Sequence, residues 1–177
     1  ILATDAENQF SIADSIDGGK GFDTLKLIDN GGLVGYTLTI PVAASIKNIE
    51  AIDIIGNANV TADTSDTTAF AGVTHLYTTS KTVAAGVNTK VTAAATTNIN
   101  VNSTNGDATG AETVVVDGGK DVTVVSKNNV VDTITVGGTT AAAGKVSVTS
   151  EGSAVGGVTL GAITVTGGTE ITVNQYG

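Results

Sequence analysis

The chain has 177 residues, no cysteine, methionine or tryptophan, and a formal net charge of −9. The lack of cysteine excludes disulfides and thiolate metal sites, and an acidic chain with only 8 Lys and Arg residues is unsuited to binding nucleic acid or an anionic membrane surface. Hydrophobic residues make up 41% of the chain, which argues against disorder, yet no apolar run is long enough to predict a membrane-spanning helix.

Near the N-terminus, residues 18–26 fit the calcium-binding nonapeptide G-G-x-G-x-D-x-U-x at every specified position. The glycines allow a turn tight enough for backbone carbonyls to converge, the aspartate adds a carboxylate, and calcium takes roughly six to eight oxygen ligands. A metal-free glycine turn capped by an aspartate is the alternative. The pattern predicts a calcium (Ca2+) site whose ligands come from Asp17, Gly19, Gly21 and Asp23, with Asp14 as a further ligand.

Two other acidic clusters are weaker candidates for a cation site. Residues 117–121 (Asp-Gly-Gly-Lys-Asp) lack the third glycine of the nonapeptide, and a plain turn is the favoured interpretation. Asp63 and Asp66 flank Ser65, and there we favour a solvated loop.

From residue 25 onwards a short pattern recurs in which two apolar residues flank a polar one, often threonine. Such alternation predicts a β-strand with one buried face. The pattern occurs at residues 25–27, 38–40, 52–54, 60–62, 91–93, 99–101, 122–124, 134–136, 146–148, 163–165 and 171–173, with 114–116 as an all-apolar variant.

The spacing of these triplets predicts the architecture. Every second triplet returns after a distance that fits a coil of about 20 to 25 residues, which is typical of solenoid repeats. We therefore predict an all-β protein built as a parallel β-solenoid, with residues 1–66 as a segment containing the calcium motif and 67–177 as a Thr/Val/Gly array continuous with it. The alternative is an antiparallel β-sandwich, in which Gly118-Gly119 and Gly167-Gly168 form hairpin turns.

Two further segments support a resemblance to known proteins. Residues 17–27 look like repeats-in-toxin (RTX) segments, and residues 45–54 are similar to a segment of bacterial surface-layer (S-layer) proteins and large type I-secreted adhesins. The array ending at residues 161–169 also looks like the β-strand repeats of those proteins, although this chain holds one full nonapeptide rather than a tandem array. The resemblance implies secretion, display on the bacterial cell surface, and calcium-driven folding or lattice assembly.

Catalysis is not expected. The single histidine, His75, falls on the same face of an alternating strand as Val73 and Tyr77, where a half-buried structural role is favoured. With one histidine and no cysteine, catalytic triads and histidine-rich metal sites are nearly excluded. Aromatic residues, at 3% of the chain, are also too scarce to suggest a strong carbohydrate site.

The sequence thus predicts a secreted, extracellular protein of the bacterial cell surface, stabilised by calcium and self-associating as an S-layer lattice or filament subunit. It has no recognisable signal peptide and begins at Ile1 as if in mid-sequence, so we expect a fragment or processed product. Cell-surface polysaccharide is a possible partner, and nucleic acid binding and membrane insertion are not expected. The alternative is an adhesin segment that binds glycan or a host surface, or a spacer within such a protein. A third idea is ice binding by an outward threonine ladder of Thr123, Thr135, Thr164 and Thr172.

Overall fold

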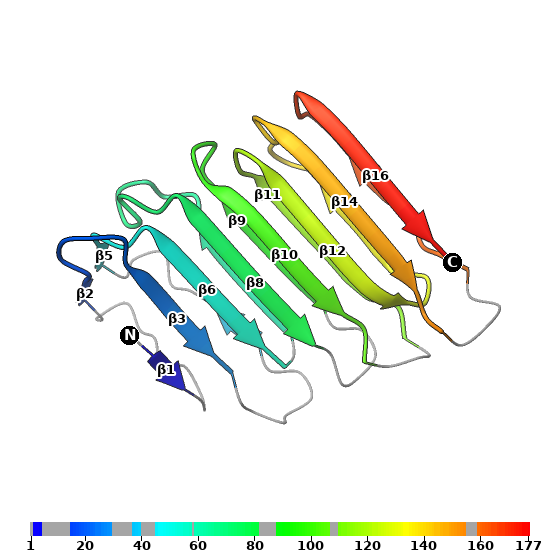
Figure 1. Cartoon of the computed structure of the whole chain (residues 1–177), viewed down its shortest axis with the longest axis horizontal. Helices are drawn as coiled ribbons and strands as arrows, with labels where there is room; N and C mark the ends of the chain where they lie inside the picture. The colour runs from blue at the N-terminus through cyan, green and yellow to red at the C-terminus, as the bar shows by residue number, and fades with distance from the viewer. Residues whose placement is uncertain are drawn as a thin grey trace.

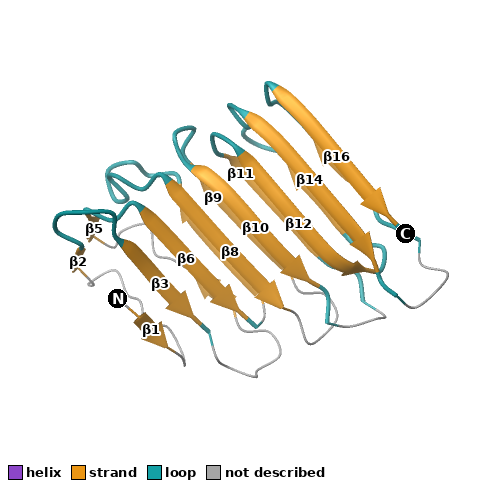
Figure 2. Cartoon of the chain, in the orientation of Figure 1, coloured by secondary structure: helices purple, strands orange, loops and turns teal. Residues whose placement is uncertain are grey.

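A computed structural model of the chain describes residues 2–4, 15–29, 37–39, 45–57, 59–81, 88–106, 110–154 and 159–177. These residues form strands and loops, with no helix among them (Figure 2). Within this part of the chain there is accordingly no helix with the length and apolar character that crossing a bilayer requires. Every strand pairs in parallel with its neighbours, and the coils stack along one axis (Figure 1). The parallel β-solenoid predicted from the triplets is confirmed.

Two large sheets form the walls of the solenoid, and every strand of the first lies one coil away from its neighbour. The eight-stranded sheet has the order β1 (Leu2–Thr4), β3 (Thr24–Ile28), β6 (Ala51–Gly56), β8 (His75–Lys81), β10 (Asn98–Thr104), β12 (Val122–Asn129), β14 (Lys145–Gly152) and β16 (Glu170–Tyr176). The six-stranded sheet has the order β15 (Ile163–Val165), β13 (Thr133–Val136), β11 (Thr113–Gly118), β9 (Asn88–Ala93), β7 (Asn59–Thr64) and β4 (Thr37–Thr39). A small third sheet pairs β2 (Ser15–Asp17) with β5 (Ser45–Lys47).

The register of the larger sheet gives the length of a coil. Paired residues lie 23 positions apart where Asn98 meets His75, and 27 apart where Ala51 meets Thr24. Both values are close to the length predicted from the spacing of the triplets. On β10, β12 and β14 each triplet stacks on the triplet of the neighbouring coil in the same sheet, with its apolar residues turned inwards.

The core is a narrow stack of aliphatic side chains between the two large sheets. Each fully buried Val, Leu or Ile contributes roughly 1.5–3 kcal/mol, so the stack supplies most of the favourable free energy of folding. The eight-stranded sheet contributes one inward row with Leu25, Ile52, Leu76, Ile99, Val122 and Val146, all at most 2% exposed. The six-stranded sheet faces it with Val60, Val91, Val114, Val116, Ile134 and Val136, all at most 1% exposed.

A buried seam of hydroxyl groups closes one side of this core. Ser80, Ser103, Ser126 and Ser150 occupy the same inward position on β8, β10, β12 and β14, and none is more than 1% exposed. Their hydroxyls form hydrogen bonds within the seam, as between Ser80 and Ser103 at 3.0 Å. The seam lies where the chain leaves the larger sheet. Hydrogen bonds between the side chains there satisfy the buried serine hydroxyls.

Gly118-Gly119 and Gly167-Gly168 are corners between sheets and not hairpin turns. All four glycines have positive φ, between 72° and 89°, as the hairpin alternative also required. Yet the strands on either side of each pair belong to different sheets and never pair with each other. The antiparallel sandwich alternative is therefore wrong. The positive φ angles of the glycines fit a corner of the solenoid as well as a hairpin turn.

Candidate functional site

The predicted calcium turn lies between β2 and β3, against the neighbouring coil. Gly19 and Gly21 have φ of 86° and 125°, conformations that side chains other than glycine rarely adopt. A Cβ on Gly18 would lie 2.1 Å from the carbonyl oxygen of Asn48, so only glycine fits where the two coils touch. Asp14, the remaining predicted ligand, lies outside the described residues.

Asp17 stabilises the turn itself. Its Oδ1 accepts hydrogen bonds from the Asn48 side-chain amide at 2.7 Å and from the Gly19 N–H at 3.0 Å. These two donors, the Asn48 amide foremost, hold the pKa of the Asp17 carboxyl below its ordinary value. Asp17 thus already satisfies two donors from its surroundings, and it joins the turn to the neighbouring coil through Asn48.

Asp23 is the residue whose environment best fits a cation. Its Oδ2 is buried and has no hydrogen-bond partner, an arrangement that is costly for a carboxylate oxygen. Its backbone N–H donates to Glu50 Oε2 at 2.7 Å, which brings a second carboxylate from the neighbouring coil up to the turn. The Asp23 carbonyl in turn accepts from the N–H groups of Glu50 and Ala51, both at 3.1 Å.

These residues define the oxygen ligands that a calcium ion at this turn could bind. Among the described residues, no group of three acidic or histidine side chains converges on one point. A calcium ion at this turn would therefore take the Asp23 carboxylate and complete its shell with glycine-turn carbonyls and water, with Glu50 near enough to contribute. The residues present fit a weak, partly hydrated calcium site better than a closed cage.

In the other two acidic clusters, carboxylates accept hydrogen bonds from backbone N–H groups. Asp66 Oδ1 accepts the N–H groups of Thr68 at 2.8 Å and of Ala69 at 3.2 Å, and the pKa of its carboxyl is lowered by them. Asp117 Oδ1 accepts the Thr139 N–H at 2.7 Å in the next coil. Such carboxylates satisfy backbone donors at the corners of the solenoid.

His75 is a half-buried residue on β8, on the same outward face as Tyr77. Its Nδ1 lies 2.9 Å from the Thr74 hydroxyl, and its Nε2 lies 3.4 Å from the Asn98 amide nitrogen. Both ring nitrogens therefore have a neighbouring partner, which fixes the orientation of the ring. The half-buried position matches the expectation from the sequence, but Val73 does not share this face, because it precedes β8 and packs in the hydrophobic core.

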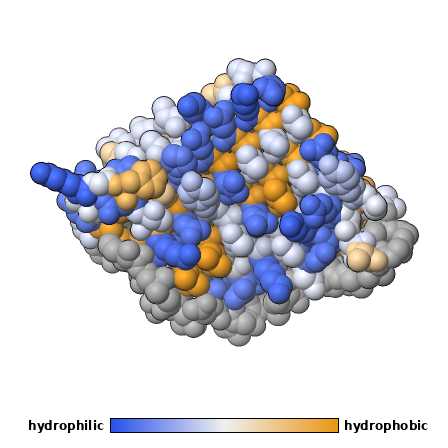
Figure 3. Space-filling model, viewed as in Figure 1, coloured by the Kyte–Doolittle hydropathy of each residue, from blue (hydrophilic) through white to orange (hydrophobic). Residues whose placement is uncertain are grey.

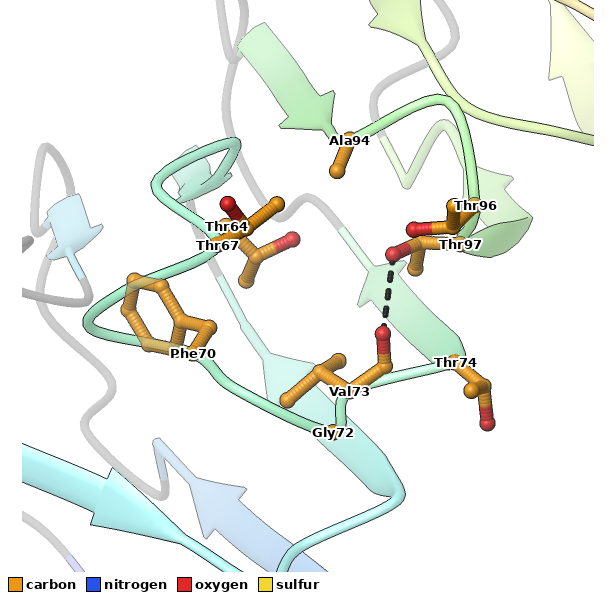
Figure 4. Close-up of a pocket in the computed structure, with 9 residues that line it drawn as sticks. All are labelled: Thr64, Thr67, Phe70, Gly72, Val73, Thr74, Ala94, Thr96 and Thr97. Atoms are coloured by element: carbon orange, nitrogen blue, oxygen red, sulfur yellow. Dashed lines mark hydrogen bonds between the residues drawn. The ribbon is translucent and has the colours of Figure 1, made fainter.

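A small cavity of about 150 Å³ opens where the loop before β8 passes the loop before β10. Figure 4 shows its threonine hydroxyls and the ring of Phe70, with a hydrogen bond from Thr97 Oγ1 to the Val73 carbonyl at 3.0 Å. None of the nine residues that line this cavity has an ionisable side chain. The cavity can hold water or a small polar group, and its lining supplies no acid or base.

Sequence reasoning missed two functional candidates. Glu50 approaches Asp23 only because the neighbouring coil returns 27 residues later, which requires the register to be known. Phe22 meets His75, which stacks on Tyr77, on the outer face of the larger sheet, although Phe22 is distant from both in sequence. Comparison of the chain with protein-family models, with curated proteins and with solved structures found no match in any of the three.

Proposed function

We propose that this chain is a non-catalytic structural segment of a secreted bacterial cell-surface protein, a subunit of an S-layer lattice or extracellular filament that calcium stabilises. The observation that carries the proposal is the apolar face that β16, the last strand of the larger sheet in this sequence, presents to a further set of strands. Ile171 and Val173 continue the inward rows of the core, yet they are 51% and 45% exposed, whereas their register partners Val146 and Val148 are at most 1% exposed. Figure 3 shows hydrophobic residues at this end of the stack.

The β16 face is suited to receive another set of parallel strands. Its backbone forms the outer edge of the eight-stranded sheet, and an unpaired strand edge is a template for pairing with another chain. Covering Ile171 and Val173 would contribute about 1 kcal/mol for each, since half of each side chain is still exposed. A second copy that stacks end to end would extend both sheets in one direction, which generates a filament or one axis of a lattice.

Sedimentation velocity with and without millimolar calcium tests the assembly. Val173→Lys places a charge on the stacking face and should abolish association, whereas Thr172→Lys on the outward face of the same strand should leave it intact. The structural proposal fails if the protein stays monomeric in calcium at high concentration.

A separate experiment tests calcium at the nonapeptide. We expect calcium to raise the melting temperature and chelator to reverse the rise, as followed by circular dichroism. Asp23→Asn should remove most of that rise, and Asp63→Asn, whose carboxylate binds Ser65 in a distant loop, should not. An equal rise in the Asp23 variant would contradict calcium binding at this turn.

A further inference from the structure

The outer face of the eight-stranded sheet carries an aromatic cluster made by two coils. Phe22 precedes β3, whereas His75 and Tyr77 lie on β8, with β6 between them. The Phe22 and His75 rings meet edge to face with centroids 5.9 Å apart, and the His75 and Tyr77 rings stack at 5.9 Å with 10° between their planes. Ala51, which pairs with His75 on β6, has the small side chain that leaves space for the ring contact to cross this strand.

The cluster is open to solvent, and its central ring is held by hydrogen bonds. Phe22 is 65% exposed and Tyr77 is 40% exposed, an unusual display in a chain with only three Phe and three Tyr. The His75 ring, held through both its nitrogens by Thr74 and Asn98, lies between the other two rings. Rigid aromatic surface loses little conformational entropy on binding a ligand, so the cluster is preorganised.

Paired charges and amides surround the rings. The register places Lys26, Asp53 and Tyr77 side by side on adjacent strands, followed by Asn100 on β10. Lys26 Nζ lies 3.1 Å from Asp53 Oδ2, so donor and acceptor stand beside the tyrosine with no net charge.

A hollow of about 270 Å³ continues the same face over β12, β14 and β16. The charged groups Asp121, Lys145 and Glu170 line it together with hydroxyl side chains of the next outward row. Lys145 Nζ and Glu170 Oε2 are 2.8 Å apart, and Asp121 Oδ1 accepts the Lys145 backbone N–H at 2.8 Å. Hydrophilic residues follow the edge at which the strands begin, from the hollow towards the aromatic cluster (Figure 3).

We propose that this face binds a neutral oligosaccharide, with sugar rings stacked on Phe22 and Tyr77 and the glycan chain running across the strands towards the hollow at Lys145. From β8 to β14 there are three strand spacings, about 14 Å in all, which is enough for several sugar units. Pyranose rings present apolar C–H groups that the electron-rich faces of aromatic rings attract. Their hydroxyls both donate and accept, which matches a surface of paired charges and amides.

The charges of the protein favour this ligand over the other polymers. A net charge of −9 repels nucleic acid and acidic polysaccharide. Aromatic residues are too scarce in the sequence to suggest a strong carbohydrate site. The fold offsets this scarcity because it gathers two exposed rings and a histidine on one face. The inference does not rest on self-association, since Ile171 and Val173 form the end of the stack, whereas Glu170 and Thr172 of the same strand line the hollow on the outer face.

A glycan array with the full chain in calcium-containing buffer identifies the class of sugar, and calorimetry with cellohexaose and chitohexaose measures the affinity. Phe22→Ala and Tyr77→Ala should each weaken binding roughly tenfold, and Tyr77→Phe should retain it. Tyr176→Ala removes a 58% exposed aromatic outside the cluster and should have no effect. Circular dichroism and melting curves show whether each variant is folded.

Three results would overturn the proposal. The first is an array on which no neutral glycan binds. The second is affinity that Phe22→Ala and Tyr77→Ala leave unchanged. The third is loss of self-association by these variants in sedimentation velocity, with no glycan binding by the wild type. The cluster would then be an interface between copies of the chain.

Discussion

The close stacking of the coils predicts that Gly118 tolerates no side chain. In Gly118→Ala, the new Cβ would lie 2.2 Å from the carbonyl oxygen of Ala93 in the preceding coil. Relief to an ordinary contact of 3.4 Å requires the coils to separate by about 1 Å at this corner. Such a separation would break the 3.2 Å hydrogen bond from the Gly119 N–H to the same carbonyl.

The cost follows from two sources. A non-glycine residue at positive φ loses about 1–2 kcal/mol, and an unsatisfied buried backbone group loses about 1–3 kcal/mol. Gly118→Ala should therefore lower the free energy of unfolding by about 2–5 kcal/mol. Gly72→Ala is the matched control, because Gly72 also has a positive φ of 97° but a Cβ there would come no closer than 3.8 Å to another atom. Gly72→Ala should lower the free energy of unfolding only by the cost of the positive φ, about 1–2 kcal/mol.

Urea denaturation followed by circular dichroism measures the difference. The two variants differ by the cost of the unsatisfied backbone group, about 1–3 kcal/mol. With an m-value of about 1–3 kcal/mol/M, the midpoint of Gly118→Ala should therefore fall about 0.3–3 M below that of Gly72→Ala. Coincident midpoints would refute the reasoning, since the coils would then have room to separate without loss.

Three other predictions concern the core and its carboxylates. Leu76→Ala should cost about 2–5 kcal/mol in urea unfolding, because Leu76 is fully buried, whereas Ile171→Ala, at 51% exposure, should cost under about 1 kcal/mol; equal losses would contradict the uncovered β16 face. Burial raises the pKa of Asp132 above 3.8, so the wild type should lose stability as the pH rises through that pKa and regain it as the pH falls towards 3.8. Asp132→Asn should remove this pH dependence. If the urea midpoints of the wild type and the variant differ by a constant amount from about pH 4 to 7, the prediction is wrong. Hydrogen bonding to the Thr68 N–H lowers the pKa of Asp66, so the contribution of this carboxylate to stability should be lost as the pH falls below 3.8 through that pKa. Asp66→Asn should reduce the loss of stability in acid, and an unchanged loss in the variant would contradict the prediction.

The solenoid was predictable because its inward rows are visible in the sequence. Each triplet places two apolar residues on the same side of a strand, and the distance between every second triplet is the length of a coil. β8 is one of the strands that no triplet predicts, since Thr78 and Ser80 take inward positions that other strands fill with aliphatic residues. A serine two residues after the triplets ending at Val101, Val124 and Val148 was the available signal for the buried seam.

The remainder depends on which coils are adjacent, and one sequence does not contain that information directly. Gly118-Gly119 has the backbone conformation of a hairpin and of a corner alike, so only the partners of the flanking strands distinguish the two. Glu50 meets Asp23, and Phe22 meets His75, because intervening coils have particular lengths. An error of one residue in register would turn every outward side chain inwards and remove both contacts.

The two faces of each strand are under different constraints, and this difference locates function. An inward residue touches the same position in the coils on both sides, so its volume is set by the stack, as for Leu76 between Ile52 and Ile99. An outward residue meets solvent, and a ring, a charge or a threonine can stand there without disturbing the core. The outward threonines illustrate this freedom, because Thr123 and Thr172 lie on one sheet and Thr135 and Thr164 on the other, which gives no single flat ladder for ice. Chemistry particular to this chain should therefore concentrate on outward rows and on the turns that feed them, where the Asp23 turn and the Phe22–His75–Tyr77 cluster both lie.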